Sequence, residues 1–385
     1  MKNNRTFLEK LLNGAEVEWK LLSLVSEMQR GKTITAKSTN EGKIPVISGG
    51  QKPAYYHSES NRDGKTITVA GSGAYAGYIM YWEEPIFVSD AFSIKTDESL
   101  LQIKYVYHFL LQNQQKIYAM KKGSGVPHVY PKDIGTLTIP IPPLSVQTEI
   151  VKILDALTAL TSELTSELIL RQKQYEYYRE KLLSFDSLEQ LNSGGGKKKL
   201  IDVAYFQNGK GHEKNIDENG SFIVINSKFI STNGTVKKYC NDQLVPLFKE
   251  DILIVMSDLP NGKALAKTFF VTEDNKYTLN QRIGRITVKE GGGLLPSFVN
   301  HFLNRNKQLT KYDNGTDQTN LRKDQILDVV IPIPPLEQQQ RIVSILDKFE
   351  TLTNSITEGL PLAIEQSQKR YEYYRELLLN FPGRE

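Results

Sequence analysis

Apolar residues recur at spacings of three and four along two long stretches of the chain. In the first stretch they are Ile150, Leu154, Leu157, Leu160, Leu164, Leu168, Tyr175, Tyr178, Leu182 and Phe185. In the second they are Ile342, Leu346, Phe349, Leu352, Ile356, Leu360, Ile364, Tyr371, Tyr374, Leu378 and Phe381. This spacing is a heptad seam and predicts two helices of about 40 residues each. Because neither helix can bury its seam alone, we expect the two to pack on one another. If they pair as an antiparallel coiled coil, the two globular units sit at opposite ends of a rod.

The two helical stretches are copies of one another. The sequence IPIPPL, followed by I-V-x-I-L-D, begins at Ile139 and again at Ile331, and YEYYRE occurs near the end of both stretches. The offset between the copies is 192 residues at the start and 196 at the end. The four extra residues amount to about one helical turn, and Gly359 and Pro361 lie close to them. We therefore expect a kink or a short break there.

The segments outside the helices show the short β-branched and aromatic runs of strands, separated by Gly and Pro. In the first globular segment the runs are residues 65–70, 78–81 and 86–89, and the counterparts in the second are 221–225, 251–256 and 283–288. Short helices are expected at 105–114 and 296–304. Each segment is therefore predicted to be an α+β domain with irregular loops.

The predicted order is domain, helix, domain, helix, with an approximate twofold relation between the halves. The expected boundaries are 1–142 for the N-terminal segment and first domain, 143–187 for the first helix, 188–199 for a flexible linker, 200–334 for the second domain, 335–381 for the second helix and 382–385 for a tail. The linker is expected from Asn192-Ser193-Gly194-Gly195-Gly196 followed by three lysines.

A glycine motif in the first segment imitates a dinucleotide-binding fingerprint. Gly71-Ser72-Gly73-Ala74-Tyr75-Ala76 fits G-x-G-x-x-A, and Asp90 lies 19 residues beyond Gly71. Such a glycine turn must open a helix, whereas residues 78–82 are strand-like and Pro85 follows. A strand–turn–strand hairpin is therefore predicted, with no nucleotide cofactor.

Composition supports a packed, intracellular protein. Apolar residues make up 39 % and charged residues 24 % of the chain. The single cysteine, Cys240, allows neither an internal disulfide nor a cysteine-based zinc site. Because no signal peptide or membrane span is evident, we expect a soluble, cytoplasmic protein. The net charge of +4 is too small to indicate nucleic-acid binding by itself.

Motifs for catalysis are missing. The sequence contains neither a P-loop nor the [DNS]-P-P-[FYW] signature of amino-methyltransferases. The five histidines are scattered without metal-ligand spacing. We therefore expect no catalytic residue, no metal and no cofactor in this chain.

The loops of both globular segments carry side chains suited to DNA. Arg, Lys, Asn and Gln can read base edges, while Lys and Ser hold phosphates. Candidate DNA-binding residues are Gln51, Lys52, Tyr55, Tyr75, Lys121, Lys122, Ser124, His128, Asn226, Lys228, Lys237, Lys238, Asn261, Lys263, Gln281, Arg282, Gln318, Asn320 and Arg322. Any one of them could be an ordinary solvated loop residue, and only their clustering within a duplicated frame favours a functional role.

The repeated I-P-I-P-P-L, I-V-x-I-L-D and Y-E-Y-Y-R-E closely resemble the conserved regions of type I restriction–modification specificity subunits. The element 71–77 with 86–92, and the run Pro127-His128-Val129-Tyr130-Pro131-Lys132-Asp133-Ile134, also resemble that family's first recognition domain. The second domain departs from this pattern at 320–324, where Pro and His are absent. Its target therefore cannot be inferred from the first domain.

The resemblance implies a non-catalytic subunit in which each domain reads half of a split DNA site and the helix pair sets the spacer. Two modification subunits using S-adenosylmethionine would dock along the helices, and restriction subunits using ATP and Mg²⁺ would join them. The expected docking residues are Gln147, Gln338, Tyr175, Tyr178, Arg179, Tyr371, Tyr374 and Arg375.

Two other classes of protein remain open at this point. The chain could be a scaffold of two protein-binding modules on a coiled coil, and a salt-dependent shift of a DNA duplex would separate that reading from a DNA reader. A recognition domain fused to an enzyme is disfavoured by the missing methyltransferase motif.

Overall fold

The computed structural model describes residues 7–191, 196–212, 214–259, 262–355 and 357–381. The chain folds into two compact units. Unit 1 comprises residues 1–164 and 363–385, and unit 2 comprises residues 165–362. Each unit therefore combines one globular domain with a part of both helical stretches, and the domain boundaries expected from the linear sequence remain a prediction.

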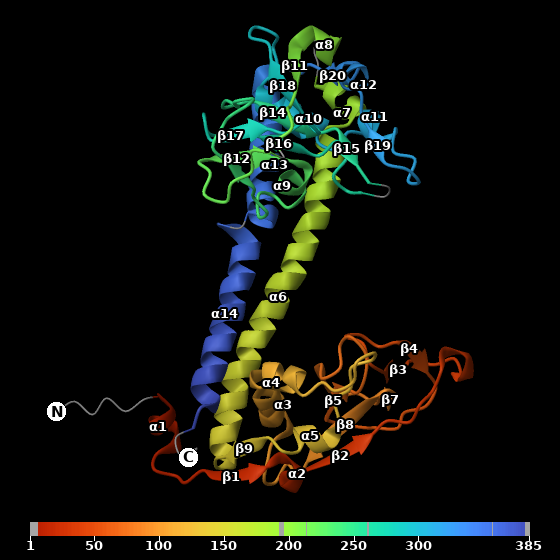
Figure 1. Cartoon of the computed structure of the whole chain (residues 1–385), viewed down its shortest axis with the longest axis vertical. Coiled ribbons are helices and arrows are strands. Elements are labelled where there is room, and N and C mark those ends of the chain that lie inside the picture. The colour runs from red at the N-terminus through yellow and green to blue at the C-terminus, as the bar shows by residue number, and fades with distance from the viewer. Residues whose placement is uncertain (1–6, 192–195, 213, 260–261, 356, 382–385) are drawn as a thin grey trace, which may run out of the picture. The chain divides into compact units, whose positions relative to one another are not determined.

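Unit 1 is built on two sheets (Figure 1). The larger has the strand order β2 (Ser26–Arg30), β8 (Ala91–Thr96), β5 (Thr66–Ala70), β6 (Ile79–Trp82), with every neighbouring pair antiparallel. The smaller has the order β4 (Tyr55–His57), β3 (Ile44–Ile47), β7 (Phe87–Val88), with β3 and β7 parallel. A separate pair joins β1 (Glu18–Leu21) to β9 (Thr138–Ile141).

The core of unit 1 lies where its larger sheet meets α3 (Ile103–Gln112). All five residues of β5 are buried, which explains why its sequence, TITVA, is apolar or β-branched throughout rather than alternating. The motif at Gly71 forms the turn between antiparallel β5 and β6, as predicted, and Gly73 and Gly77 take positive φ there.

Unit 2 repeats this topology. Its larger sheet has the order β11 (Ala204–Asn208), β18 (Ile283–Val288), β14 (Ile252–Val255), β16 (Thr268–Phe270). Its smaller sheet has the order β13 (Tyr239–Cys240), β12 (Phe222–Ile225), β17 (Tyr277–Leu279), again with one parallel pair, and β10 (Lys197–Lys199) joins β20 (Val330–Pro332).

The matching topology corrects the predicted pairing of strands between the two domains. β12 corresponds to β3, and β14 corresponds to β5. β18 corresponds to β8, so the run at 86–89 has its counterpart in β17 instead. The order of apolar runs along the chain was misleading because short strands such as β3 and β16 were not recognised as runs.

The other elements are short. They are α1 (Phe7–Leu12), α2 (Leu22–Val25), η1 (Ala36–Ser38), α4 (Gln114–Ala119), α5 (Pro131–Ile134), α7 (Phe185–Gln190), α8 (Leu200–Val203), α9 (Ser227–Ser231), α10 (Pro296–Leu303), α11 (Lys307–Thr310), α12 (Lys323–Leu327), β15 (Ser257–Asp258) and β19 (Thr319–Asn320). The helices expected at 105–114 and 296–304 are thus present as α3 and α10.

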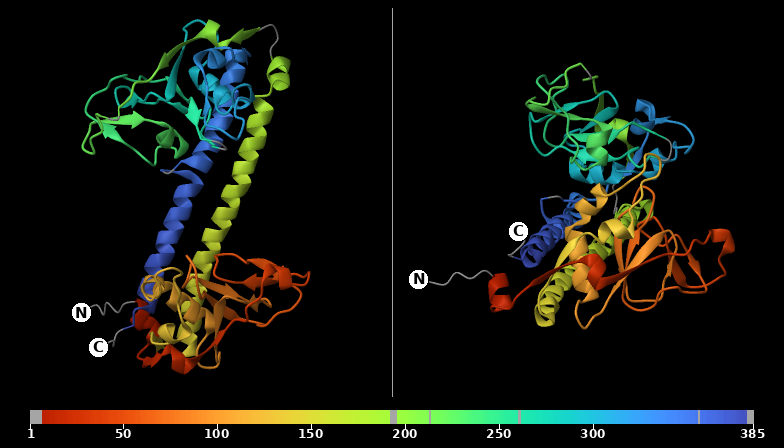
Figure 2. Two further views of the ribbon diagram at one scale, coloured as in Figure 1. Left: turned by 45° about the vertical axis from the view of Figure 1, so that its right-hand side comes forward. Right: turned by 60° about the horizontal axis from the view of Figure 1, so that its bottom comes forward.

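Both long helical stretches are present, and they pack antiparallel within each unit. The first stretch is α6 (Leu144–Leu182), one helix of 39 residues. In unit 1, α6 and α14 (Gly359–Leu379) lie side by side (Figure 2), with Thr161 Oγ1 2.9 Å from Ser367 Oγ. In unit 2, Tyr175 and Tyr178 of α6 contact Glu350 and Phe349 of α13 (Leu336–Asn354).

The second stretch, expected over 335–381 with a kink or a short break, is interrupted. α13 ends at Asn354 and α14 begins at Gly359, so the break predicted near Gly359 and Pro361 lies just before them. Gly359 has φ +79°, and a Cβ there would lie 2.5 Å from the carbonyl oxygen of Thr351. The four extra residues of the second copy are thus accommodated in the break rather than as an added helical turn.

The expected linker over 188–199 is also corrected at both of its ends. Leu188 is fully buried in α7, and Lys197–Lys199 pair as β10 with β20. Residues 192–195 lie outside the described part of the chain. The lysines that follow the glycine run belong to a strand rather than to a linker, because strand pairing needs only backbone partners.

No helix within the described residues is both long and apolar enough to cross a membrane.

Candidate nucleic-acid interface

Three loops of unit 1 are held together by backbone hydrogen bonds at one end of the larger sheet. The N–H of Gly71 donates to the carbonyl of Asp90 (3.2 Å), and the N–H of Val129 donates to the carbonyl of Gly71 (3.0 Å). Gly73 likewise donates to Pro127 (3.0 Å). We call residues 71–78, 89–90 and 121–130, together with the adjoining loop 48–52, the first loop cluster.

A fourth loop, residues 48–52, closes on this cluster through Gly49. A Cβ at Gly49 would lie 2.6 Å from the carbonyl oxygen of Ser72 and 3.6 Å from the Asp90 carboxylate. The Ser72 hydroxyl in turn donates a hydrogen bond to that carboxylate. Glycine is therefore required at position 49 by the close approach of the two loops.

The surface of the first loop cluster also carries stacked cations and rings. The His128 and Tyr130 rings are stacked with centroids 6.0 Å apart. The Arg30 guanidinium and the Lys132 ammonium lie 5.5 and 5.8 Å from the Tyr130 ring centroid. Such cation–π contacts hold positive charge at a surface without an acidic partner. A polar hollow of about 180 Å³ adjoins them, lined among others by Arg30, Asp90 and His128.

Most first-domain candidates meet at this cluster. The loops that form it carry Gln51, Lys52, Tyr75, Lys121, Lys122, Ser124 and His128. Two of these lysines also stabilise it, since Lys121 Nζ donates to the carbonyl of Ala74 (3.1 Å) and Lys122 Nζ pairs with Asp133 (2.7 Å). Tyr55 lies apart in β4, where its hydroxyl donates to the carbonyl of Ile34.

Sequence reasoning missed Arg30, Asp90, Tyr130 and Lys132 as candidates. Tyr130 and Lys132 stand inside the run that carried the family resemblance, so their sequence context was available. Arg30 comes from β2, about 100 residues earlier, and only the fold brings it to Tyr130.

Unit 2 forms a second loop cluster with equivalent backbone bonds. The N–H of Met256 donates to the carbonyl of Arg282 (3.1 Å), and the N–H of Leu321 donates to the carbonyl of Met256 (2.7 Å). β15 pairs with β19 here, and Gln318 Nε2 donates to Ser257 Oγ (2.7 Å). We call the described residues of 256–264, with 280–282 and 316–322, the second loop cluster.

Asp258 shapes one loop of the second cluster. Its carboxylate accepts hydrogen bonds from the N–H groups of Ala264 (2.7 Å) and Leu265 (3.1 Å). These bonds fold the loop back toward β14 and leave Lys263 exposed on it. Asp258 therefore has a structural role in this loop.

Most of the second-domain candidates also lie on or beside their loop cluster. The cluster carries Lys263, Gln281, Arg282, Gln318, Asn320 and Arg322. Asn226 and Lys228 adjoin it, because the N–H of Asn280 donates to the carbonyl of Ile225 (3.1 Å). Lys237 and Lys238 precede β13, where the N–H of Val224 donates to the carbonyl of Lys238 (2.8 Å), and Asn261 lies outside the described residues.

A histidine joins the globular domain of unit 1 to its helix pair. His108 of α3 places Nε2 2.9 Å from Asp155 of α6 and Nδ1 3.0 Å from the hydroxyl of Tyr371 in α14. Lys104 also binds the Asp155 carboxylate, at 2.9 Å. Burial would raise the pKa of Asp155, but the hydrogen bonds from His108 and Lys104 outweigh it and leave the pKa below its ordinary value.

The second copy builds a related contact in unit 2. His301 of α10 places Nε2 2.7 Å from Asp347 of α13, and its Nδ1 lies 3.7 Å from Glu350. The Tyr175 hydroxyl donates to Glu350 at 2.6 Å. The two carboxylates are thus held by the His301 ring and by the Tyr175 hydroxyl.

These contacts correct part of the expected docking set. Gln147 is fully buried, where it accepts from the N–H of Gln102 (2.9 Å) and donates to two carbonyls. Its equivalent in the second copy is Gln339, also fully buried, rather than Gln338. Tyr371 is only 4 % exposed. Repetition along the sequence does not distinguish a docking residue from one that holds the domain to its helices.

The repeated Y-E-Y-Y-R-E motif nevertheless leaves two tyrosines outward in each copy. Tyr177 and Tyr178 are 59 % and 40 % exposed, and Tyr373 and Tyr374 are 62 % and 39 % exposed. Each pair is in edge-to-face contact, with ring centroids 5.3 and 5.4 Å apart.

The two arginines of the motif are occupied within their own units. Arg179 donates to the carbonyl oxygens of His301 and Asn304. The Arg375 guanidinium lies 5.0 Å from the centroid of the Tyr371 ring.

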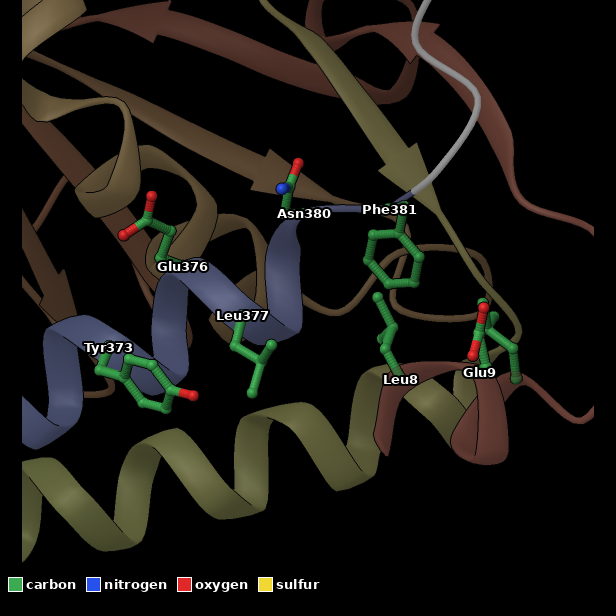
Figure 3. Close-up of a pocket in the computed structure, with 8 residues that line it drawn as sticks. Leu8, Glu9, Tyr373, Glu376, Leu377, Asn380 and Phe381 are labelled. Carbon is green, nitrogen blue, oxygen red and sulfur yellow. The ribbon is translucent and has the colours of Figure 1, made fainter. Parts of the chain in front are cut away.

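An apolar groove adjoins one of these tyrosine pairs. It has a volume of about 520 Å³ and lies between α1 and the end of α14, lined among others by Leu12, Tyr373 and Leu377. Figure 3 shows Phe381 and Leu8 pointing toward one another across it, with Leu377 and Tyr373 further along α14.

Two copies of one sheet topology, each fastened to a helix pair and carrying different side chains on equivalent loops, define a duplicated recognition protein. The sequence profile of the type I restriction modification DNA specificity domain matches residues 16–171 and again residues 192–366. A putative type I restriction enzyme specificity subunit of Haemophilus influenzae is 40 % identical over 99 % of this chain and 100 % of its own length. A type I specificity subunit of Escherichia coli is 30 % identical over 98 % of this chain and 97 % of its own.

Solved structures share the fold. The S subunit of a type I restriction–modification system from M. genitalium superposes with a TM-score of 0.62 at 19 % identity, covering 97 % of this chain and 98 % of that one. The chain therefore belongs to the family of type I restriction–modification specificity subunits. Members of this family recognise DNA and are not themselves catalysts.

Proposed function

We propose that each unit reads one half of a split DNA target with its loop cluster. The observation that carries this proposal is the equivalence of the two clusters: the same backbone bonds connect the same loops, while the side chains on those loops differ. A shared frame with different side chains is what two readers of different sequences require.

The loop chemistry supports direct contact with duplex DNA. In the first cluster, Lys52 and Ser124 are exposed and suited to phosphate oxygens, while Gln51 can bind an adenine edge. In the second, Gln281 and Arg322 are exposed on adjoining loops. The candidate residues at each cluster form the proposed interface of that unit.

The same proposal assigns the exposed tyrosine pairs to assembly with other subunits. Each unit presents one pair from the same motif, so two equivalent sites are available. Two copies of a modification subunit would dock there, one for each pair. The partners, rather than this chain, would use S-adenosylmethionine for methylation and ATP with Mg²⁺ for restriction.

Methylome sequencing of a host that carries this chain with its modification subunit tests the function. A split adenine-methylated motif with a fixed unread spacer is expected. Methylation without a sequence motif, or no salt-dependent binding of a DNA duplex by the assembled complex, would contradict the proposal and favour a protein-binding scaffold.

A further inference from the structure

Asp90 and Arg282 occupy the same backbone position in the two units. Each carbonyl accepts a hydrogen bond from the residue that follows the central strand of the larger sheet, Gly71 in unit 1 and Met256 in unit 2. Each is followed at once by the strand that pairs with that central strand, β8 or β18. The match therefore comes from the fold and not from sequence similarity.

The neighbouring strands fix the same equivalence independently. The N–H of Gly31 donates to the carbonyl of Ala91 (2.9 Å), the residue after Asp90. The N–H of Gly209 donates to the carbonyl of Ile283 (3.2 Å), the residue after Arg282. The second residue after each central strand also pairs in the same way: Ser72 forms an antiparallel β-bridge with His128, and Ser257 forms one with Asn320.

The Asp90 carboxylate is exposed and has no ion-pair partner within the described residues. It accepts one hydrogen bond, from the Ser72 hydroxyl, and borders the polar hollow that also contains Arg30 and His128. The serine fixes the direction of the carboxylate and leaves its remaining acceptor sites open toward solvent.

The Arg282 guanidinium is exposed as well, and among the described residues of unit 2 it has no side-chain partner. Arg285, three residues later, shows the contrast: its guanidinium lies 2.9 Å from Asp251 and it is only 18 % exposed. Arg282 is therefore an unused donor at the second cluster, whereas Arg285 is part of the domain's own structure.

Opposite charges at one position call for different groups on DNA. Phosphates repel a carboxylate, so an acid in the interface is favourable only where it accepts from an amino group of cytosine or adenine. A guanidinium at the same position matches the O6 and N7 acceptors of guanine. We propose that Asp90 reads a cytosine or adenine in the first half-site and that Arg282 reads a guanine in the second. This inference rests on the function proposed above.

The test uses the whole chain assembled with its modification subunits and a pool of DNA duplexes randomised in both half-sites. Motifs selected by the wild type are compared with those selected by Asp90→Asn and Arg282→Gln. We expect each variant to lose at least tenfold discrimination at one base of its own half-site, with the other half-site unchanged.

Matched controls lie at the far ends of the same sheets. Asp63→Asn removes an exposed acid before β5, and Lys249→Gln removes an exposed cation before β14, both at the end opposite the loop cluster. Neither should alter the motif. Thermal unfolding of all four variants checks that the fold is retained.

Three results would overturn the inference while leaving the proposed function intact. They are an unchanged motif in both variants, equal weakening on every duplex of the pool, and a change in the opposite half-site. Failure of the wild type to select any split motif would instead contradict the proposed function itself.

Discussion

At the scale of single residues, the repeated motifs serve mainly to hold each globular domain on its helices. His108 forms hydrogen bonds both with Asp155 of the first I-L-D motif and with Tyr371 of the second Y-E-Y-Y-R-E motif. Because Nε2–H donates to the carboxylate, Nδ1 is free to accept from the tyrosine hydroxyl. The Asp155 carboxylate, the His108 ring and the Tyr371 hydroxyl thus bind one another, and residues of both motifs take part.

The hydrogen bonds of Asp155 predict that the stability of unit 1 depends on pH. Asp155→Asn should lower the free energy of unfolding by about 1–2 kcal/mol at pH 7, because the variant loses the charged partner of His108 and Lys104. Since the pKa of Asp155 is below its ordinary value in the folded chain, its contribution is complete above about pH 4 and is lost as the pH falls through the folded value.

Urea unfolding of both proteins from pH 7 to pH 3 measures this effect. The difference between wild type and variant should shrink toward pH 3. Asp63→Asn, an exposed acid in the same unit, serves as the control and should change little. A difference that is constant across this pH range would mean that Asp155 contributes through shape rather than charge.

At the scale of elements, the second helical stretch differs from the first by the break between α13 and α14. The break between α13 and α14 depends on Gly359, whose positive φ and close approach to Thr351 exclude a side chain. Gly359→Ala should therefore destabilise the chain by about 1–2 kcal/mol in thermal or urea unfolding. Gly125→Ala, with open space around its Cα, should be nearly neutral. Equal stability of the two variants would show that the break tolerates a side chain.

The exposed tyrosine pairs make a second prediction at this scale. Tyr177→Ser and Tyr373→Ser should each weaken binding of one modification subunit by tenfold or more, because exposed aromatic residues dominate many interfaces. Native mass spectrometry would show one bound copy in either single variant and none in the double variant. Tyr205→Ser, a 66 % exposed tyrosine in β11, is the control. Two bound copies in the double variant would exclude these docking sites.

At the scale of the whole molecule, the proposed role of the helices is to set the spacer of the DNA target. Inserting four residues after Leu164 of α6, and four after Leu362 of α14, lengthens both helices by about one turn, about 6 Å. The methylated motif should then gain about one or two base pairs of spacer with unchanged half-sites. The same insertion in the glycine run at 194–196 should have no effect. An unchanged spacer after the paired insertions would contradict the proposed role.

The sequence by itself determined the duplication, the helices, the hairpin at Gly71 and the family. These features follow from local patterns: heptad spacing, glycine and proline residues that end strands and helices, and repeated sequence motifs. None of these patterns depends on contacts between distant parts of the chain. The sequence also placed most DNA-binding candidates on loops that the fold brings together, because loops without apolar residues must lie at the surface.

Only the tertiary structure decided how these pieces are used. It buried Gln147 and Tyr371, residues that repetition alone had suggested for docking, because a repeated residue can serve an internal joint as well as a partner. It also matched Asp90 to Arg282, which share no sequence context. Equivalence of position in a sheet is set by hydrogen bonds between strands far apart in the chain, so a pattern along the sequence does not contain it.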